Sequence, residues 1–118
     1  MSVTPGFRDF VLEQLGRSVP GIRGRSMFGG VGIYGRGFFF ALIADDTLYF
    51  KVDESNRPDF EARGTGPFRP YGEDGEVMQY YRVSDDLLED PEALGLWAEK
   101  AIIVAQRSKS RHTRRGGV

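Results

Sequence analysis

The glycines between Gly30 and Gly35 have the clearest spacing for chemistry. The run Gly30-Val31-Gly32-Ile33-Tyr34-Gly35 matches the G-x-G-x-x-G pattern of dinucleotide-binding folds, and Asp53 follows at about the distance of a ribose-binding acid. That chemistry needs a helix directly after the glycines, because the helix N-terminus holds the pyrophosphate. Here Phe38-Phe39-Phe40 follows, which favours a turn and a strand. We therefore interpret the glycines as allowing a bulge or close backbone packing in a strand, and we predict no cofactor.

Few other groups in the chain are able to do chemistry. The absence of cysteine excludes thiol catalysis, thiolate metal sites and disulfides. His112 is the only histidine, and it has no acid or hydroxyl partner in an ordered element. The pairs Asp45-Asp46 and Asp85-Asp86 lie in an expected turn and before an expected helix, and no ligand spacing such as an EF-hand loop appears. We therefore predict neither catalytic nor metal-binding residues, and we expect a protein that is not an enzyme.

The distribution of charge suggests one kind of binding. The net charge is −1, yet residues 45–100 hold six basic and fifteen acidic residues, whereas residues 101–118 hold five basic and no acidic ones. Basic residues in such a tail could neutralise phosphates in a sequence-independent and salt-sensitive way. They are Arg107, Lys109, Arg111, Arg114 and Arg115. The alternative is a tail that only keeps the chain in solution. Tyr80 and Tyr81 could stack on bases, but strand alternation must bury one of them, which favours core packing.

Long helices are expected near both ends of the chain. Thr4-Pro5 opens the first as N-cap and first helical residue, and apolar residues recur at helical spacing up to Gly16. Asp90-Pro91-Glu92 opens the last, which continues to about Arg107. Outside its main apolar stripe this helix carries further apolar residues, namely Leu96, Ile103 and Val104. We therefore expect the sheet to cover one side of it and a second subunit the other.

Between these helices the pattern changes to aromatic and β-branched runs. The expected strands are 27–34, 38–44, 48–52 and 77–83. The first three form a meander through turns at Gly35-Arg36-Gly37 and Asp45-Asp46. A short helix is predicted from Asp53 to Arg63, with Gly64 as its stop. The fold class is therefore α+β, with an antiparallel sheet of about four to five strands.

One domain is all that 118 residues comfortably hold. We expect it to span residues 1–107, followed by a basic and disordered tail over residues 108–118. The N-terminus lacks the basic stretch and apolar run of a signal peptide, and no apolar run approaches the roughly 18–20 residues needed to span a bilayer. We therefore expect a cytoplasmic protein without a membrane partner.

The segment that begins at Arg25 carries a family resemblance. Its Met-Phe-Gly-Gly stretch resembles the opening strand of the N-terminal domain of the TfoX/Sxy competence regulators. The agreement continues through Leu48-Tyr49-Phe50-Lys51-Val52-Asp53, Met78-Gln79-Tyr80-Tyr81 and Leu96-Trp97-Ala98-Glu99-Lys100-Ala101, and it covers about residues 5–108. The motif residues, to which we assign a structural role, are Arg25, Met27, Phe28, Gly29 and Gly30.

The resemblance implies a compact α+β domain, and an association with transcriptional control of DNA uptake alongside a DNA-binding activator. Full-length regulators of this kind carry a second, C-terminal domain, whereas this chain ends after the last helix and the tail. We therefore expect a non-catalytic regulatory or adaptor module that contacts a protein partner, with the transcription machinery as one candidate, and that forms a homodimer. The alternative is weak, sequence-independent nucleic-acid binding through the basic tail.

Overall fold

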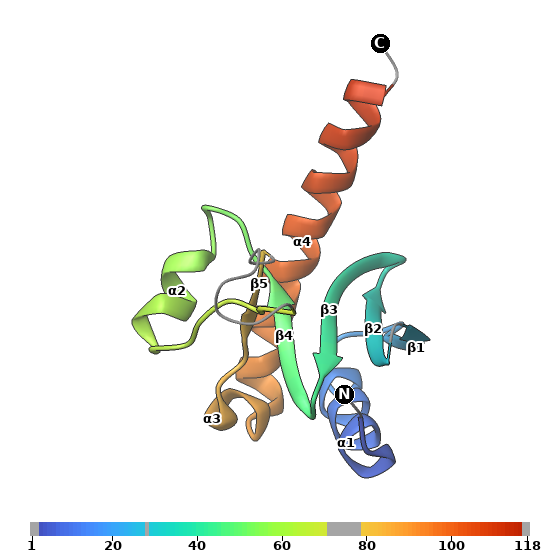
Figure 1. Cartoon of the computed structure of the whole chain (residues 1–118), viewed down its shortest axis with the longest axis vertical. Coiled ribbons are helices and arrows are strands. Elements are labelled where there is room, and N and C mark those ends of the chain that lie inside the picture. Colours follow the sequence, from blue (N-terminus) through green and yellow to red (C-terminus); the bar gives the residue numbers. More distant parts are fainter. Residues whose placement is uncertain (1–2, 28, 71–78, 117–118) are drawn as a thin grey trace.

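The structure is a computed structural model that describes residues 3–27, 29–70 and 79–116, with side chains up to residue 109. Within these residues, five strands form one antiparallel sheet in the order β1-β2-β3-β4-β5, and a long helix, α4, crosses it (Figure 1). The strands are β1 (Arg23–Met27), β2 (Gly30–Gly35), β3 (Phe38–Ala44), β4 (Thr47–Lys51) and β5 (Tyr80–Arg82). The helices are α1 (Pro5–Gly16), α2 (Arg57–Ala62), α3 (Asp85–Leu88) and α4 (Pro91–Gly116). The predicted α+β class and antiparallel sheet are confirmed.

Both long helices begin where the sequence predicted. The Thr4 hydroxyl accepts a hydrogen bond from the Phe7 amide at 3.4 Å, and Pro5 is the first residue of α1. The Asp90 carboxylate accepts one from the Ala93 amide at 3.2 Å at the start of α4. Asp46 adds a tertiary contact: its carboxylate accepts a hydrogen bond from the Thr4 amide at 2.8 Å. The start of α1 is therefore anchored to the turn between β3 and β4.

Two of the predicted turns are also confirmed. Arg36 and Gly37 join β2 to β3 with φ values of 50° and 83°, and Asp45 and Asp46 join β3 to β4 with 50° and 52°. Positive φ at both central residues matches the right-handed twist of the flanking strands, which is why such two-residue turns recur in hairpins. Glycine and aspartate tolerate this left-handed conformation better than most residues.

The predicted single strand from Met27 to Tyr34 is wrong. The chain reverses between Met27 and Gly30, which pair with each other, so the predicted three-stranded meander has four strands. Gly29 has a φ of 77°, which glycine adopts without strain. Gly30 lies so close to β3 that only glycine fits there without a clash, because a Cβ atom would stand 2.5 Å from the carbonyl oxygen of Ile43. Phe28 lies outside the described residues.

The predicted helix from Asp53 to Arg63 is shorter in the structure. Asn56 is buried just before α2, where its amide nitrogen donates to the Lys51 carbonyl at 3.1 Å and its carbonyl oxygen accepts from the Asp53 amide at 2.8 Å. These bonds hold a turn ahead of the helix, so α2 starts four residues later than predicted. The stop at Gly64 is confirmed by its φ of 77°. Of the strand predicted at 77–83, residues 77 and 78 lie outside the described part.

The last helix continues beyond its predicted end near Arg107, and its backbone is helical to Gly116 (Figure 1). The sequence instead predicted a disordered tail from residue 108. The physical reason for the difference is that residues 108–115 contain neither Gly nor Pro, and that lysine and arginine favour helices. Cations near a helix C-terminus also interact favourably with its dipole. No helix in the described residues is long and apolar enough to cross a membrane.

The hydrophobic core lies between the sheet and α4, with α1 and α3 at its lower end in Figure 1. Its largest side chains are aromatic: the rings of Phe40 and Phe50 lie 5.6 Å apart, and the ring of Phe60 lies 4.8 Å from that of Trp97. Gln14 is a buried polar residue whose amide donates to the Leu88 carbonyl at 3.0 Å. This bond ties α1 to α3 and satisfies a group that would otherwise destabilise the core.

We expect Gly30→Ala to lower the free energy of unfolding by about 1–3 kcal/mol, since the added methyl must displace backbone of β3 rather than a flexible side chain. Gly6→Ala is the matched control. Gly6 lies in α1 with nothing within 4 Å of the added methyl, so alanine there should leave stability equal or higher by about 0.5–1 kcal/mol. Urea denaturation followed by circular dichroism measures both. Equal stability of the two variants would contradict the close approach.

Candidate functional site

The glycine run lies entirely on β2, and no helix follows it. The ladder to β3 shifts register between Ile33 and Tyr34, as expected of a bulge. A Cβ atom on Gly35 would stand 2.6 Å from Cδ1 of Ile102 on α4. The interpretation of these glycines as a bulge with close packing is confirmed.

The motif residues at the start of the sheet have different surroundings. Arg25 is exposed on β1, opposite Gly32 of β2. The Met27 side chain packs on that same glycine: a Cβ atom on Gly32 would stand only 2.7 Å from the Met27 Cε. The Gly29 turn and the close approach at Gly30 complete the β1–β2 hairpin. These positions therefore shape one edge of the sheet.

The basic residues predicted to contact nucleic acid lie on the C-terminal half of α4. The Arg107 guanidinium donates to the Ser55 hydroxyl at 3.2 Å, and the Lys109 ammonium lies 5.6 Å from the centre of the Phe38 ring. Arg111, Arg114 and Arg115 follow on the same helix, and their side chains lie outside the described ones. Two of the five residues thus contact the body of the domain, and nucleic-acid binding by the set remains a prediction.

The acidic pairs take part in local structure. Asp46 holds the start of α1, and Asp86 forms an ion pair with Arg63. Hydrogen bonds from Ser84 and Arg63 lower the pKa of the Asp86 carboxyl below its usual range. Among the described side chains, no group of three or more histidines or carboxylates is placed to hold a metal ion. His112 lies on α4, and its side chain is outside that part of the structure.

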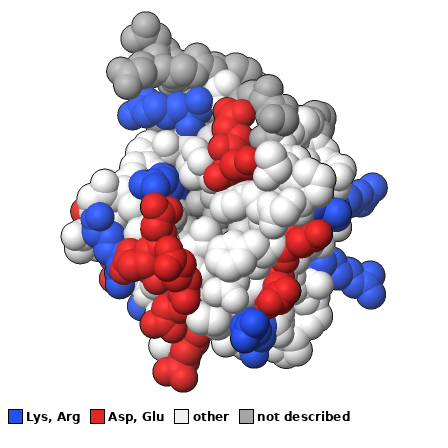
Figure 2. Space-filling view, turned by 90° about the horizontal axis from the view of Figure 1, so that it is seen from below, with Lys and Arg blue, Asp and Glu red and all other residues white. Residues whose placement is uncertain are grey.

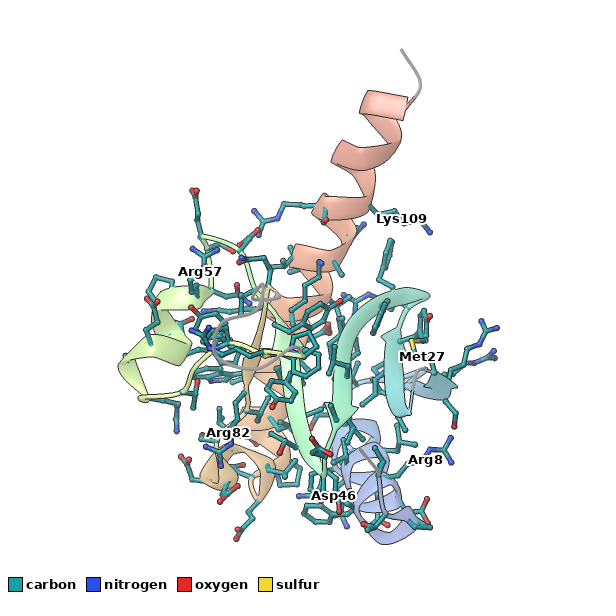
Figure 3. All side chains as sticks on the ribbon, in the orientation of Figure 1. Arg8, Met27, Asp46, Arg57, Arg82 and Lys109 are labelled. Atoms are coloured by element: carbon teal, nitrogen blue, oxygen red, sulfur yellow. The ribbon has the colours of Figure 1, made fainter. Side chains whose placement is uncertain are left out.

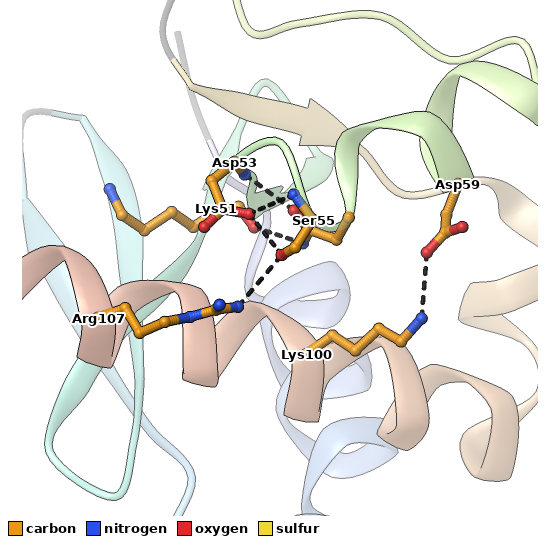
Figure 4. A network of polar contacts seen from close by, with 7 residues as sticks. Lys51, Asp53, Ser55, Asp59, Lys100 and Arg107 are labelled. Carbon is orange, nitrogen blue, oxygen red and sulfur yellow. Dashed lines mark hydrogen bonds and ion pairs between the residues drawn. The ribbon is translucent and has the colours of Figure 1, made fainter.

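Beside α4, the end of β4 and the turn that follows it form a hollow of about 860 Å³. We name it the basic hollow. Its charged and hydroxyl-bearing lining residues are Lys51, Asp53, Glu54, Ser55, Arg57, Arg107 and Ser108. Figure 4 shows Arg107 reaching from α4 to Ser55, with Lys51 and Asp53 close by. Cations from β4, α2 and α4 therefore line one depression.

The cations of the basic hollow contact neutral groups. Arg57 donates to the side-chain oxygen of Gln79 at 3.0 Å, and Arg107 donates to Ser55. The Lys51 ammonium lies 5.0 Å from the centre of the Tyr80 ring. Burial lowers the pKa of Lys51, and the nearby carboxylate of Asp53 partly offsets this effect. The hollow thus gathers positive charge, of which Lys51 and Arg57 are half-buried and Arg107 is exposed.

A second hollow, of about 390 Å³, adjoins the first, and Lys51 and Ser108 line both. We name it the ring hollow because four aromatic residues line it, Tyr34, Phe38, Phe39 and Tyr80. The rings of Tyr34 and Phe39 are stacked at 5.3 Å, and those of Phe39 and Tyr80 lie 5.8 Å apart. Lys109 lies at its edge. In the view of Figure 3, Arg57 and Lys109 lie to either side of α4.

The outer face of α4 is a different kind of surface. Leu96 and Ile103 are 67% and 45% exposed, whereas Val104, expected with them outside the main stripe, is buried. Two ion pairs flank the exposed pair: Glu99 with Arg36 at 2.6 Å, and Lys100 with Asp59 at 3.2 Å. We use the name outer face for Leu96 and Ile103 together with Glu99 and Lys100.

Charge is unevenly distributed along α4. Acidic residues gather at its start, on α3 and the first turn of α4, and Figure 2 views this end of the molecule, where several carboxylates are exposed. They are Asp85, Asp86, Glu89, Asp90 and Glu92. The C-terminal half of the helix carries Arg107 and Lys109, followed in the sequence by three arginines. The helix therefore has an acidic beginning and a basic end.

Sequence reasoning missed Lys51 and Arg57 as members of a site. A signal for Lys51 existed: alternation along β4 buries Leu48 and Phe50, which leaves Tyr49 and Lys51 on the other face. The sequence also predicted that strand alternation buries one of the two neighbouring tyrosines of β5, and Tyr80 is the buried one. The sequence did not show the strand register, which pairs Tyr80 with Lys51.

A comparison with protein families agrees with these observations. A family model described as the TfoX N-terminal domain matches residues 13–105, and it confirms the resemblance seen in the sequence. No curated protein matches the chain.

Burial raises the pKa of Tyr80 to about 12, with a smaller contribution from Tyr34. An unfolded chain ionises this phenol near pH 10. The phenol therefore stabilises the fold fully below pH 10, and this contribution falls as the pH rises towards 12, by up to about 3 kcal/mol. We expect Tyr80→Phe to show a smaller loss of stability between about pH 10 and 12, in urea denaturation at each pH. An identical alkaline loss in both proteins would contradict this.

Proposed function

The chain belongs to the TfoX N-terminal domain family, and from this premise we propose that it is a non-catalytic regulatory or adaptor module. In this proposal it acts in the transcriptional control of competence through protein–protein contacts, with the transcription machinery and a second copy of itself as partners. Family membership supports the regulatory part. The outer face of α4 supports the protein contacts, and it is the observation that carries the proposal.

The outer face has the pattern of a contact surface. Leu96 and Ile103 are seven residues apart, so they lie two turns apart on the same side of the helix, opposite the buried stripe that includes Leu94 and Ala101. Exposed apolar groups with a polar rim are typical of surfaces that bind other proteins. Here the rim consists of the ion pairs made by Glu99 and Lys100.

The charge distribution favours a second copy of the chain as the occupant. If two α4 helices pack side by side and antiparallel, the acidic beginning of each lies near the basic end of the other. With Leu96 of each helix against Ile103 of the other, Glu92 of one helix lies near Arg107 of its partner, and Glu99 lies near Lys100. Antiparallel helices also have opposed dipoles, which attract each other. A parallel arrangement would instead bring like charges together.

The test is the oligomeric state in solution, measured by size-exclusion chromatography with light scattering at micromolar concentration. We expect the wild-type chain to be a dimer and the double variant Leu96→Glu, Ile103→Glu to be a monomer, because each glutamate would be placed against apolar surface in the dimer. Phe10→Glu is the control: Phe10 is 40% exposed on α1, away from the outer face, so this variant should remain a dimer. Circular dichroism shows whether each variant is folded.

A monomeric wild-type chain would remove self-association from the proposal. The regulatory part has a separate test, a competence-gene transcription reporter in the native cell. We expect deletion of the gene to lower transcription, and we expect the wild-type chain but not Leu96→Glu, Ile103→Glu to restore it. Full restoration by the double variant would overturn the assignment of the outer face.

A further inference from the structure

We propose that the basic hollow and the ring hollow together bind one nucleotide unit, an aromatic base joined through its sugar to a phosphate. This inference goes beyond the proposed function and involves a surface that shares only Arg107 with the proposed dimer contact. The same chemistry is present in a free nucleotide and in one unit of a single-stranded nucleic acid. The argument rests on three features of the described residues: a cationic end, an aromatic end, and the residues that join them.

The basic hollow supplies the phosphate end. Arg57 and Arg107 approach it from α2 and α4, and their hydrogen bonds are to neutral oxygens of Gln79 and Ser55. A phosphate at this point could take these donors without breaking an ion pair between the arginines and a carboxylate. The planar guanidinium group with its several donors suits phosphate oxygens well. The Ser108 hydroxyl lines the same hollow and adds a neutral donor, whereas the Ser55 hydroxyl already donates to the Asp53 carboxylate at 2.5 Å.

Carboxylates also line the basic hollow, so its charge must be weighed. Asp53 and Glu54 stand against Lys51, Arg57 and Arg107, which leaves an excess of one positive charge. The Asp53 carboxylate accepts a hydrogen bond from the Ser55 amide at 2.7 Å, so it is engaged in shaping the turn. Lys109 adds a further cation from the adjoining hollow.

The ring hollow supplies the base end. Tyr34, Phe38 and Phe39 are half-buried, so part of each ring remains accessible. Tyr34, Phe39 and Tyr80 already form a row with ring centres 5.3 and 5.8 Å apart, which a base could extend by stacking. Stacking on rings accepts any base, so we expect little base preference.

Lys51 joins the two ends. It lines both hollows, and its ammonium lies over the Tyr80 ring. Ser108 of α4 also lines both, on the side of the helix that faces them. The volumes of the two hollows, about 860 and 390 Å³, fall in the range of sites for small ligands. An anion beside Lys51 would also offset the desolvation that lowers the pKa of this lysine.

The experiment titrates the full-length chain with four probes: AMP, ribose 5-phosphate, inorganic phosphate and a fluorescein-labelled single-stranded oligodeoxythymidine. Calorimetry reports on the first three and fluorescence polarisation on the last. We expect AMP to bind more tightly than ribose 5-phosphate, because only AMP carries a base. Tighter binding of the oligonucleotide than of AMP would identify single-stranded nucleic acid as the source, and the reverse would identify the free nucleotide.

Variants locate the site. We expect Arg57→Ala with Arg107→Ala to lower the affinity for AMP and for the oligonucleotide at least about tenfold. Tyr34→Leu with Phe39→Leu should lower them by about tenfold and leave ribose 5-phosphate unchanged. Arg17→Ala is the control, because it removes an exposed arginine at the end of α1 that lines neither hollow, so it should change neither affinity.

The salt dependence and the C-terminal arginines separate this site from a basic tail. The one phosphate held in the basic hollow should lower oligonucleotide affinity only about 2.6-fold when salt rises from about 50 to about 200 mM, whereas a basic tail that neutralises several phosphates should give a steeper loss. Arg111→Gln, Arg114→Gln and Arg115→Gln together should leave AMP affinity unchanged. The proposal is overturned if neither AMP nor the oligonucleotide binds, if AMP binds no better than inorganic phosphate, or if only the triple variant weakens binding.

Discussion

The packing of α4 against the sheet is the contact on which the rest of the structure depends. This helix packs against β3, β4, α1 and α3, so it joins the helices α1 and α3 to the sheet. Its buried side includes the small residues Ala98, Ala101 and Ala105, which let the helix approach the strands closely. Ile102 packs directly against Gly35 of β2. Any side chain larger than that of glycine at this position would clash with Ile102. Because one side of α4 is committed to the core, its other side and its basic end are left for contacts outside the domain.

Much of the fold follows from local sequence signals. The caps at Thr4 and Asp90, the two hairpin turns and the strands at 38–44 and 48–52 each depend on a few neighbouring residues, so they could be predicted. The β1–β2 hairpin was missed because apolar residues on both sides of Gly29 concealed a reversal that depends on one positive φ. The buried Asn56, which delays α2, bonds to backbone groups before it, and such bonds leave no periodic signal.

The candidate site was harder to predict, because its members are distant in the chain. Lys51 and Arg57 meet Arg107 only because β4 and α4 pack together, and no local pattern records that contact. The sequence did single out Arg107 and Lys109 by their charge, and the structure adds the hydroxyl and the ring that they contact. The outer face could be predicted only in part: the sequence showed that the helix is apolar around much of its circumference. The sequence did not show which of these apolar residues stay exposed, because that depends on which side of α4 packs on the sheet.

The position of α4 in the chain has a consequence for how the protein reaches its native state. The strands β1 to β4 are neighbours in sequence, joined by tight turns, so they can pair as soon as they leave the ribosome. The helix that covers their apolar face is synthesised some forty residues later than β4, counted from Lys51 to Pro91. Until then Ile33, Phe40 and Phe50 have no cover from α4. The nascent sheet is therefore the stage of synthesis at which aggregation or chaperone capture is most favoured, and docking of α4 ends it.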